Sequence, residues 1–295
     1  MVLQRHPFVA NEKKSPVART FLFLAIFLLV SAGWVAALDP GHRISQYGHS
    51  SWKIQDGYFG SQPVSITQTT DGYLWVETEG GIFRFDGVQF VSWTSLTGEK
   101  LPSNDYWPML GARDGSLYIG TDSGLLRWAH QRSTRYLDGG TVGGIIQDEK
   151  GQIWFTHYRP GKDSDPLCRI SGTDVRCYGF ATGDGALPYG PGPLAEDASG
   201  SFWVAQDTAV VRWKAGSAKI YQLTYQGSIG VRDLAVADDG SVWIGIETAG
   251  HGGGLQHVVG GVMQPFAVPK LNGETLRVCA LLIDRQGSLW VGTLG

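Results

Sequence analysis

The sequence of 295 residues is poor in cysteine and methionine, with three of each, and only 17% of its residues are charged. It has no basic stripe outside the N-terminus, which argues against a nucleic-acid partner. No long stretch has the periodicity of an amphipathic helix. It also lacks a nucleophile elbow, a zinc-protease helix motif and a P-loop. We therefore expect no catalytic residue, cofactor site or metal site in this chain.

Glycine and aromatic residues, in contrast, are abundant. There are 42 Gly, 11 Trp, 11 Tyr and 12 Phe, and apolar residues make up 42% of the sequence. Glycine suits tight turns, and aromatic residues favour strands. This composition predicts an all-β fold with a sizeable core.

The N-terminal 37 residues have the pattern of an export signal. Residues 20–38 are uncharged, follow four basic residues and end in the small residues Ala36 and Ala37. This pattern indicates a secretory signal cleaved before Leu38, or alternatively an uncleaved membrane anchor. Residues 1–37 are thus assigned to export, and residues 38–295 are expected in the periplasm.

One short motif recurs six times in the remainder. Its glycine is followed three residues later by Trp, or by Tyr in the second copy, inside an apolar run. The glycines are Gly72, Gly115, Gly151, Gly200, Gly240 and Gly287. Their mean spacing of 43 residues suits a β-propeller built of four-stranded blades. Residues 38–295 are therefore predicted to form a partial propeller with six repeats begun.

Each repeat predicts the same four strands. An inner strand leads into a glycine turn, the Trp strand follows, then a strand carrying an Arg, and finally a more polar strand such as 89–93. The recurring Trp is interpreted as core between blades. The recurring Arg is expected to bind carbonyls or a turn Asp between blades, because guanidinium is suited to such contacts.

The repeats resemble the two-component regulator propeller family. The resemblance covers roughly residues 38–295 and is most specific over residues 44–105, which include Gln68–Trp75, Arg84–Phe90 and Leu101–Asp105. It implies a periplasmic sensor module with seven-bladed propellers. A histidine kinase, diguanylate cyclase or DNA-binding regulator would supply the output. A membrane tether through a missing C-terminal part, and a homodimer of the full-length protein, are further expectations.

The sequence departs from the family pattern at two places. Residues 56–63 are looser than the family's Asp-Gly-Leu-Pro turn, and the sequence ends at Gly295, just after the Trp strand of copy six. The last blade is therefore incomplete, and we interpret the chain as an N-terminal fragment without its output domain. A seven-bladed ring is expected in the full protein.

Cys168 and Cys177 flank a predicted hairpin whose turn is Ser171–Asp174. Cross-strand pairing places the two cysteines opposite each other, so the alternatives are a disulfide or two free thiols. Cys279 lies in an apolar run and is expected in the core.

Ligand-contact residues are expected in long loops at one rim of the propeller. These loops are residues 101–107, 158–166, 182–193 and 249–253. Their aromatic candidates for stacking on a sugar or peptide are Tyr106, Trp107, Tyr158 and Tyr189.

Besides a pure assembly scaffold, two functions remain open at this point. The leading hypothesis is a periplasmic propeller that senses an unknown small molecule, sugar or peptide for a bacterial signalling receptor. The alternative is a propeller enzyme, such as a lyase or a quinoprotein-type dehydrogenase, because propellers host both binding and chemistry. His251 and His257 are the best catalytic candidates for that alternative.

Overall fold

The computed structural model describes residues 51–101, 108–137, 139–159, 165–179, 182–183, 187, 192–206, 209–225, 227 and 230–294. Chain contacts divide the protein into Met1–His49 and Ser50–Gly295. The predicted export segment, residues 1–37, lies outside the described residues. Within the described part, no helix has the length and apolar character needed to cross a membrane.

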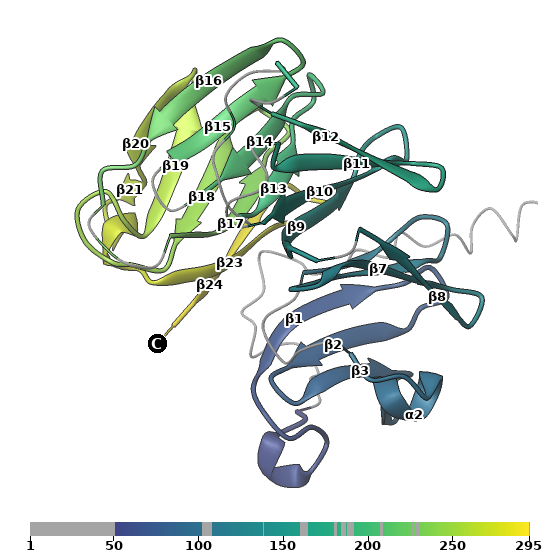
Figure 1. Cartoon of the computed structure of the whole chain (residues 1–295). Helices are drawn as coiled ribbons and strands as arrows, with labels where there is room; N and C mark the ends of the chain where they lie inside the picture. Colours follow the sequence, from purple (N-terminus) through teal and green to yellow (C-terminus); the bar gives the residue numbers. More distant parts are fainter. Residues whose placement is uncertain are drawn as a thin grey trace, which may run out of the picture. The chain divides into compact units, whose positions relative to one another are not determined.

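The fold is an all-β propeller, as predicted, with five complete four-stranded antiparallel blades (Figure 1). Blades 1 to 3 consist of β1 (Pro63–Gln68), β2 (Leu74–Thr78), β3 (Gly81–Phe85), β4 (Phe90–Ser92), β5 (Met109–Gly111), β6 (Leu117–Thr121), β7 (Gly124–Ala129), β8 (Arg132–Tyr136), β9 (Thr141–Gln147), β10 (Ile153–Tyr158), β11 (Leu167–Ser171) and β12 (Asp174–Tyr178). Blades 4 and 5 consist of β13 (Leu194–Glu196), β14 (Phe202–Ala205), β15 (Ala209–Lys214), β16 (Ser217–Gln222), β17 (Val231–Val236), β18 (Val242–Ile246), β19 (Leu255–Val259) and β20 (Val262–Pro265).

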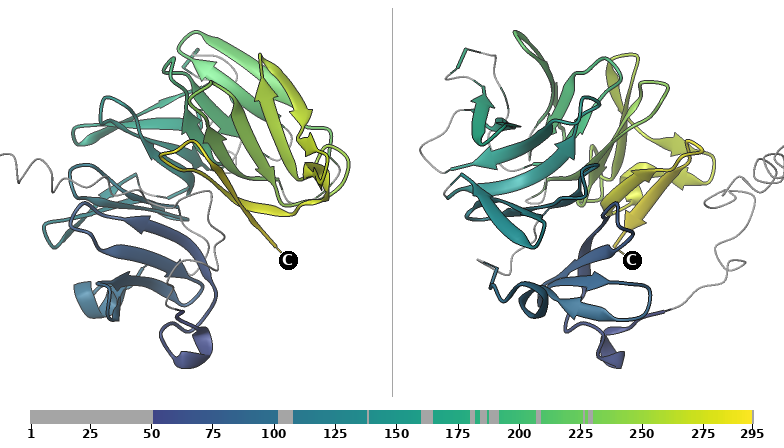
Figure 2. Two further views of the ribbon diagram at one scale, coloured as in Figure 1. Left: turned by 180° about the vertical axis from the view of Figure 1, so that it is seen from behind. Right: turned by 90° about the vertical axis from the view of Figure 1, so that its right-hand side faces the viewer.

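The sixth copy of the motif forms the two-stranded sheet β23 (Val278–Ile283) and β24 (Leu289–Thr293). A small hairpin, β21 (Ala267–Val268) and β22 (Leu271–Asn272), precedes it together with the short helix η3 (Gly273–Thr275). Another short helix, η2 (Ile54–Asp56), precedes blade 1. Figure 2 shows the blades following one another in chain order.

The predicted fourth strand of blade 1 is shorter than expected. It ends at Ser92, and Trp93 begins the short helix α2 (Trp93–Thr97). The Ser92 hydroxyl caps this helix by accepting a hydrogen bond from the Ser95 backbone N–H at 3.2 Å. Because the helix turns the chain, Trp93 packs into the core between blades 1 and 2.

The motif glycine has one structural role in all six copies. Each adopts a positive φ between 72° and 89°, where a side chain would be strained. Its N–H donates to the carbonyl of the residue three positions earlier, which closes the turn between the first two strands, as from Gly200 to Asp197 at 2.7 Å. The sequence motif therefore marks the turn that follows each innermost strand.

The core is divided among the interfaces between successive blades. Trp154 of blade 3, for example, packs with Phe202 and Trp213 of blade 4. Trp203 of blade 4 packs in turn with Ile244 of blade 5. This confirms the interpretation of the repeated tryptophans as core between blades.

The recurring Arg bonds within its own blade rather than between blades, which corrects the expectation. Arg127 bonds the turn residue Asp114 at 2.9 Å, and Arg212 bonds the turn residue Asp197 at 2.8 Å. The third strand lies beside the second in register, so Arg212 faces Trp203 and its guanidinium lies 5.8 Å from that ring's centroid. This geometry brings the Arg to the turn of its own sheet.

Candidate functional site

Antiparallel order places all the long loops at one end of the blades. The short glycine turns and the turns from the third to the fourth strand lie at one end, which we call the turn face. The connections from the second to the third strand, and from each blade to the next, lie at the opposite end, which we call the loop face. The loop at residues 249–253 and the described ends of the other three loops expected to contact ligand belong to the loop face.

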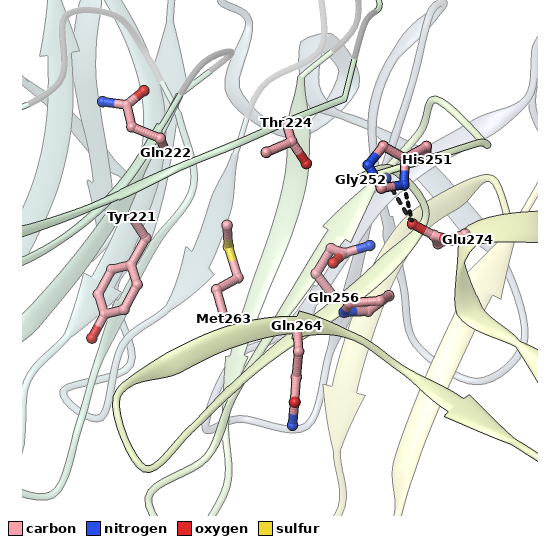
Figure 3. Close-up of a pocket in the computed structure, with 10 residues that line it drawn as sticks. Tyr221, Gln222, Thr224, His251, Gly252, Gln256, Met263, Gln264 and Glu274 are labelled. Carbon is pink, nitrogen blue, oxygen red and sulfur yellow. Dashed lines mark hydrogen bonds and ion pairs between the residues drawn. The ribbon is translucent and has the colours of Figure 1, made fainter.

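A pocket of about 330 Å³ opens between blades 4 and 5 (Figure 3). Its volume is at the low end of the range for small-molecule sites. Three glutamines, two from blade 5, contribute amides to the lining. The lining residues are Tyr221, Gln222, Thr224, His251, Gly252, Gln256, Met263, Gln264, Pro265 and Glu274.

Glu274 organises one wall of this pocket. Its Oε1 accepts a hydrogen bond from the Gly252 N–H at 2.7 Å and lies 3.5 Å from Nδ1 of His251 (Figure 3). Asn272 in turn holds the short helix η3 by accepting the Glu274 N–H at 3.0 Å. The wall therefore presents a half-buried carboxylate beside a histidine whose side chain is 90% exposed.

Gly252 is required for this close approach. Its φ of 72° favours glycine, and a Cβ there would lie 2.3 Å from the Thr224 hydroxyl oxygen. The loop after β18 can therefore contact the segment that follows β16.

The floor of the pocket is fixed by buried groups. Gln256 is 3% exposed and donates from Nε2 to the Gly253 carbonyl at 2.6 Å. Tyr221 stacks on Trp203 with ring centroids 5.3 Å apart. Lys219 on β16 donates to the Gly261 carbonyl of blade 5 at 2.8 Å. Such a site suits a neutral or cationic polar ligand, because its amides, hydroxyl and carboxylate include no fixed cation.

The two histidine candidates are in different surroundings. His251 lines the pocket, whereas His257 on β19 contacts Trp243 and Phe266, with centroids 5.1 and 5.9 Å away. Burial lowers the pKa of His257 and so favours its neutral form. His257 is not among the residues that line the pocket.

The structure describes one of the four aromatic residues that were expected to contact ligand, Tyr158. Tyr158 ends β10, is partly buried and does not line the pocket. Tyr106, Trp107 and Tyr189 lie outside the described residues. No group of three or more His, Cys, Asp or Glu side chains in the described ranges could hold a metal ion.

Sequence reasoning missed Gln256, Gln264, Thr224 and Glu274. These residues come from separate strands and connections, so no local spacing links them. The one available signal was the glycine-rich loop at residues 249–253, which was expected on the binding rim and which supplies His251 and Gly252.

Cys168 and Cys177 face each other in the register of β11 and β12 and form a disulfide, with Cα atoms 4.0 Å apart. Cys279 is a free thiol on β23 and is only partly buried, so its expected place in the core is wrong. Burial raises the pKa of its thiol.

Known proteins support the propeller assignment. A family model described as "Two component regulator propeller" matches residues 272–295, which confirms the resemblance over copy six. No curated protein matches the chain.

Several solved structures share the fold. A catalytically inactive virginiamycin B lyase from Staphylococcus aureus with quinupristin is 17% identical, with 78% of this chain and 76% of that chain covered and a TM-score of 0.58. PorZ, a surface component of the type-IX secretion system of Porphyromonas gingivalis, is 15% identical, with 79% and 39% covered and a TM-score of 0.56. The extracellular domain of a proposed hybrid two component system from B. thetaiotaomicron is 17% identical, with 80% and 38% covered and a TM-score of 0.46. At such identities, the first two likenesses concern the fold alone, and the third is too weak to bear on it.

Proposed function

We propose that this chain is the exported propeller of a bacterial signal-transduction receptor and that it binds a small polar ligand. The observation that carries the proposal is the match of copy six to a two-component regulator propeller repeat. The export pattern in residues 1–37 and the pocket between blades 4 and 5 support it. In this proposal the chain itself catalyses no reaction, and the output belongs to another part of the protein.

Export can be tested separately from binding. A reporter enzyme that is active only after export, fused after residue 294, should be active in a bacterial host. Deletion of residues 1–37 should abolish that activity while leaving the fusion protein detectable. An active fusion without residues 1–37 would contradict the proposed route.

Ligand binding can be tested by thermal unfolding of the chain with a panel of neutral sugars, short peptides and amines. A ligand at about 100 times its Kd should stabilise the folded state by about 2.7 kcal/mol. For a chain of this size, that corresponds to a rise in Tm of roughly 5–10 °C. The Gln264→Leu variant should lose the rise, because Gln264 lines the pocket.

Gln89→Leu is the matched control, since Gln89 is an exposed residue of blade 1. A ligand whose effect is equal in wild type, Gln264→Leu and Gln89→Leu does not bind in this pocket.

The pairing of His251 with Glu274 favours one alternative, an elimination reaction of the kind named for the lyase neighbours. Incubating the chain with quinupristin and following the substrate by chromatography tests this alternative. Turnover that disappears in His251→Ala would favour an enzyme over a sensor. Absence of turnover would rule out quinupristin as a substrate of this chain.

A further inference from the structure

A second polar cluster lies on the loop face, outside the pocket, where blade 5 meets β23. Glu247 follows β18, and its side chain is only 9% exposed. Arg232 of β17 donates from Nε to its Oε2 at 2.6 Å, and Arg277, just before β23, approaches its Oε1 with NH2 at 3.4 Å. Each oxygen of this buried carboxylate therefore has its own arginine.

A β-bulge places Arg232 in this position. In blades 1, 3 and 5 and in β23, the innermost strand contains one extra residue at the same place, eight residues before the motif glycine. The extra residues are Val64, Gly143, Arg232 and Cys279. A bulge re-aims a side chain out of the regular alternation, and bulges are frequent next to functional sites. All four residues remain at least partly exposed at the loop-face end of their strands.

The charges of the cluster do not balance. Two guanidinium groups, which stay protonated at all ordinary pH values, share the single charge of Glu247. Across the described ranges, neither arginine has a second carboxylate within ion-pair distance. The nearest other acid in sequence is Asp233, whose carboxylate is occupied by the N–H groups of Leu234 and Leu281, each at 2.8 Å.

The two arginines are also accessible. Their side chains are 44% and 51% exposed, while the carboxylate that holds them is buried. Arg232 uses only Nε on Glu247, which leaves both of its terminal nitrogens as donors. Two guanidinium groups held on one carboxylate, with spare N–H groups, offer the donors that an oxyanion needs.

We infer that Arg232 and Arg277 form an anion-binding site at the loop-face end of the innermost strands, specific for the oxyanion group of a phosphate, sulfate or carboxylate ligand. Glu247 holds both side chains through hydrogen bonds, which a glutamine can partly replace, while its negative charge competes with the anion for the two arginines. The site is separate from the pocket between blades 4 and 5, and its existence does not depend on a sensory role for the protein.

Calorimetric titration of the whole chain with inorganic phosphate, sulfate and acetate, at constant ionic strength set with chloride, tests the inference. Saturable binding of at least one anion is expected, and the three titrations distinguish the sources of the oxyanion. Arg277→Gln should raise its Kd about tenfold, the scale of one hydrogen bond to a charged group. Arg135→Gln, on the outermost strand of blade 2, is a matched exposed arginine and should leave the Kd unchanged.

Glu247→Gln provides a test of opposite sign. It removes the competing negative charge while retaining a polar side chain, so the anion should bind several-fold more tightly. An ion cluster with a purely structural role would not change the Kd of the anion in opposite directions in Arg277→Gln and Glu247→Gln. Unsaturable heats in wild type, or equal Kd values for wild type, Arg277→Gln and Glu247→Gln, would overturn the inference.

Discussion

Blades 4 and 5 share the sequence Gly-Ser-x-Trp in their glycine motif but hold the tryptophan differently. In blade 4, the indole N–H of Trp203 donates to Asp197 at 2.9 Å, and Trp203 is 3% exposed. In blade 5, the residue equivalent to Asp197 is Ala237, and Trp243 is only partly buried. The residue three positions before the glycine therefore decides whether the tryptophan is anchored.

The same rule holds in the other copies. Asp148 accepts the indole N–H of Trp154 at 2.9 Å, Asp284 accepts that of Trp290 at 2.8 Å, and Thr69 accepts that of Trp75 at 3.1 Å. Copy two has Ala112 at this place, and its aromatic residue is Tyr118, which carries no indole.

Blades 4 and 5 also differ at the position of the recurring arginine. Arg212 of blade 4 faces Trp203 in the strand register and bonds Asp197 at 2.8 Å. His257 faces Trp243 in the corresponding register of blade 5 and packs against that ring instead. In blade 5 the loss of the acid thus coincides with the loss of the arginine, whereas in blade 2, which has Ala112 at the acid position, Arg127 bonds a different turn acid, Asp114.

The largest effect is expected for Asp197→Ala. Asp197 accepts hydrogen bonds from Trp203, Arg212 and the backbone of Ser201, so its removal leaves buried donors without a partner. We expect a loss of about 3 kcal/mol in the free energy of unfolding, measured by urea denaturation. Asp239→Ala in blade 5 is the control and should cost far less, because Asp239 is exposed and, among the described residues, accepts side-chain hydrogen bonds from Ser241 alone.

Lowering the pH should remove the stabilisation that Asp197 gives to blade 4. Burial opposes ionisation of Asp197, but hydrogen bonds from Ser199, Arg212, Trp203 and Ser201 outweigh it and hold its pKa far below the usual value. Its stabilisation is therefore complete above the unfolded pKa of about 3.9 and is lost as pH falls toward the folded pKa. The stability difference between wild type and Asp197→Asn should shrink between pH 5 and pH 2. A constant difference over that range would contradict this account.

The variants Trp203→Phe and Trp243→Phe should differ in their free energy of unfolding, by less than the loss expected for Asp197→Ala. Both remove an indole N–H, but only Trp203 donates to a buried carboxylate. We expect Trp203→Phe to cost about 1 kcal/mol more than Trp243→Phe in the same denaturation assay. Equal costs would indicate that ring volume alone matters.

The smallest effect is expected from building the missing acid into blade 5. Ala237→Asp places a carboxylate near Trp243 and His257, and we expect a gain of about 0.5 kcal/mol. Burial now lowers the pKa of His257, and a neighbouring carboxylate should raise it. Titration of the imidazole by NMR in wild type and variant measures this shift, and no upward shift would show that blade 5 cannot adopt the arrangement of blade 4.

Much of the fold could be read from the chain because its signals are local. A glycine with positive φ and an apolar Trp strand lie within a few residues of each other, so six copies predicted six turns and the strands beside them. The disulfide partners are likewise close, since their hairpin has a recognisable turn. The helix beginning at Trp93 was missed, because packing of that ring between blades overrides the strand pattern.

The candidate sites could not be read in this way. The pocket takes its polar groups from β16, β19, β20 and η3, and the arginine pair takes one residue from each of two blades. Such groups meet only after the blades have packed, so no spacing along the chain predicts these sites.

The sequence by itself therefore determined the all-β class, the blade period and the position of each turn, because hairpins depend on neighbouring residues. Only the tertiary structure decided which side chains from separate strands meet: that Arg212 bonds the turn of its own blade, that Glu274 lies beside His251, and that Glu247 holds two arginines. The physical reason is that such contacts depend on strand register and sheet packing. Both are determined jointly by residues far apart in the chain.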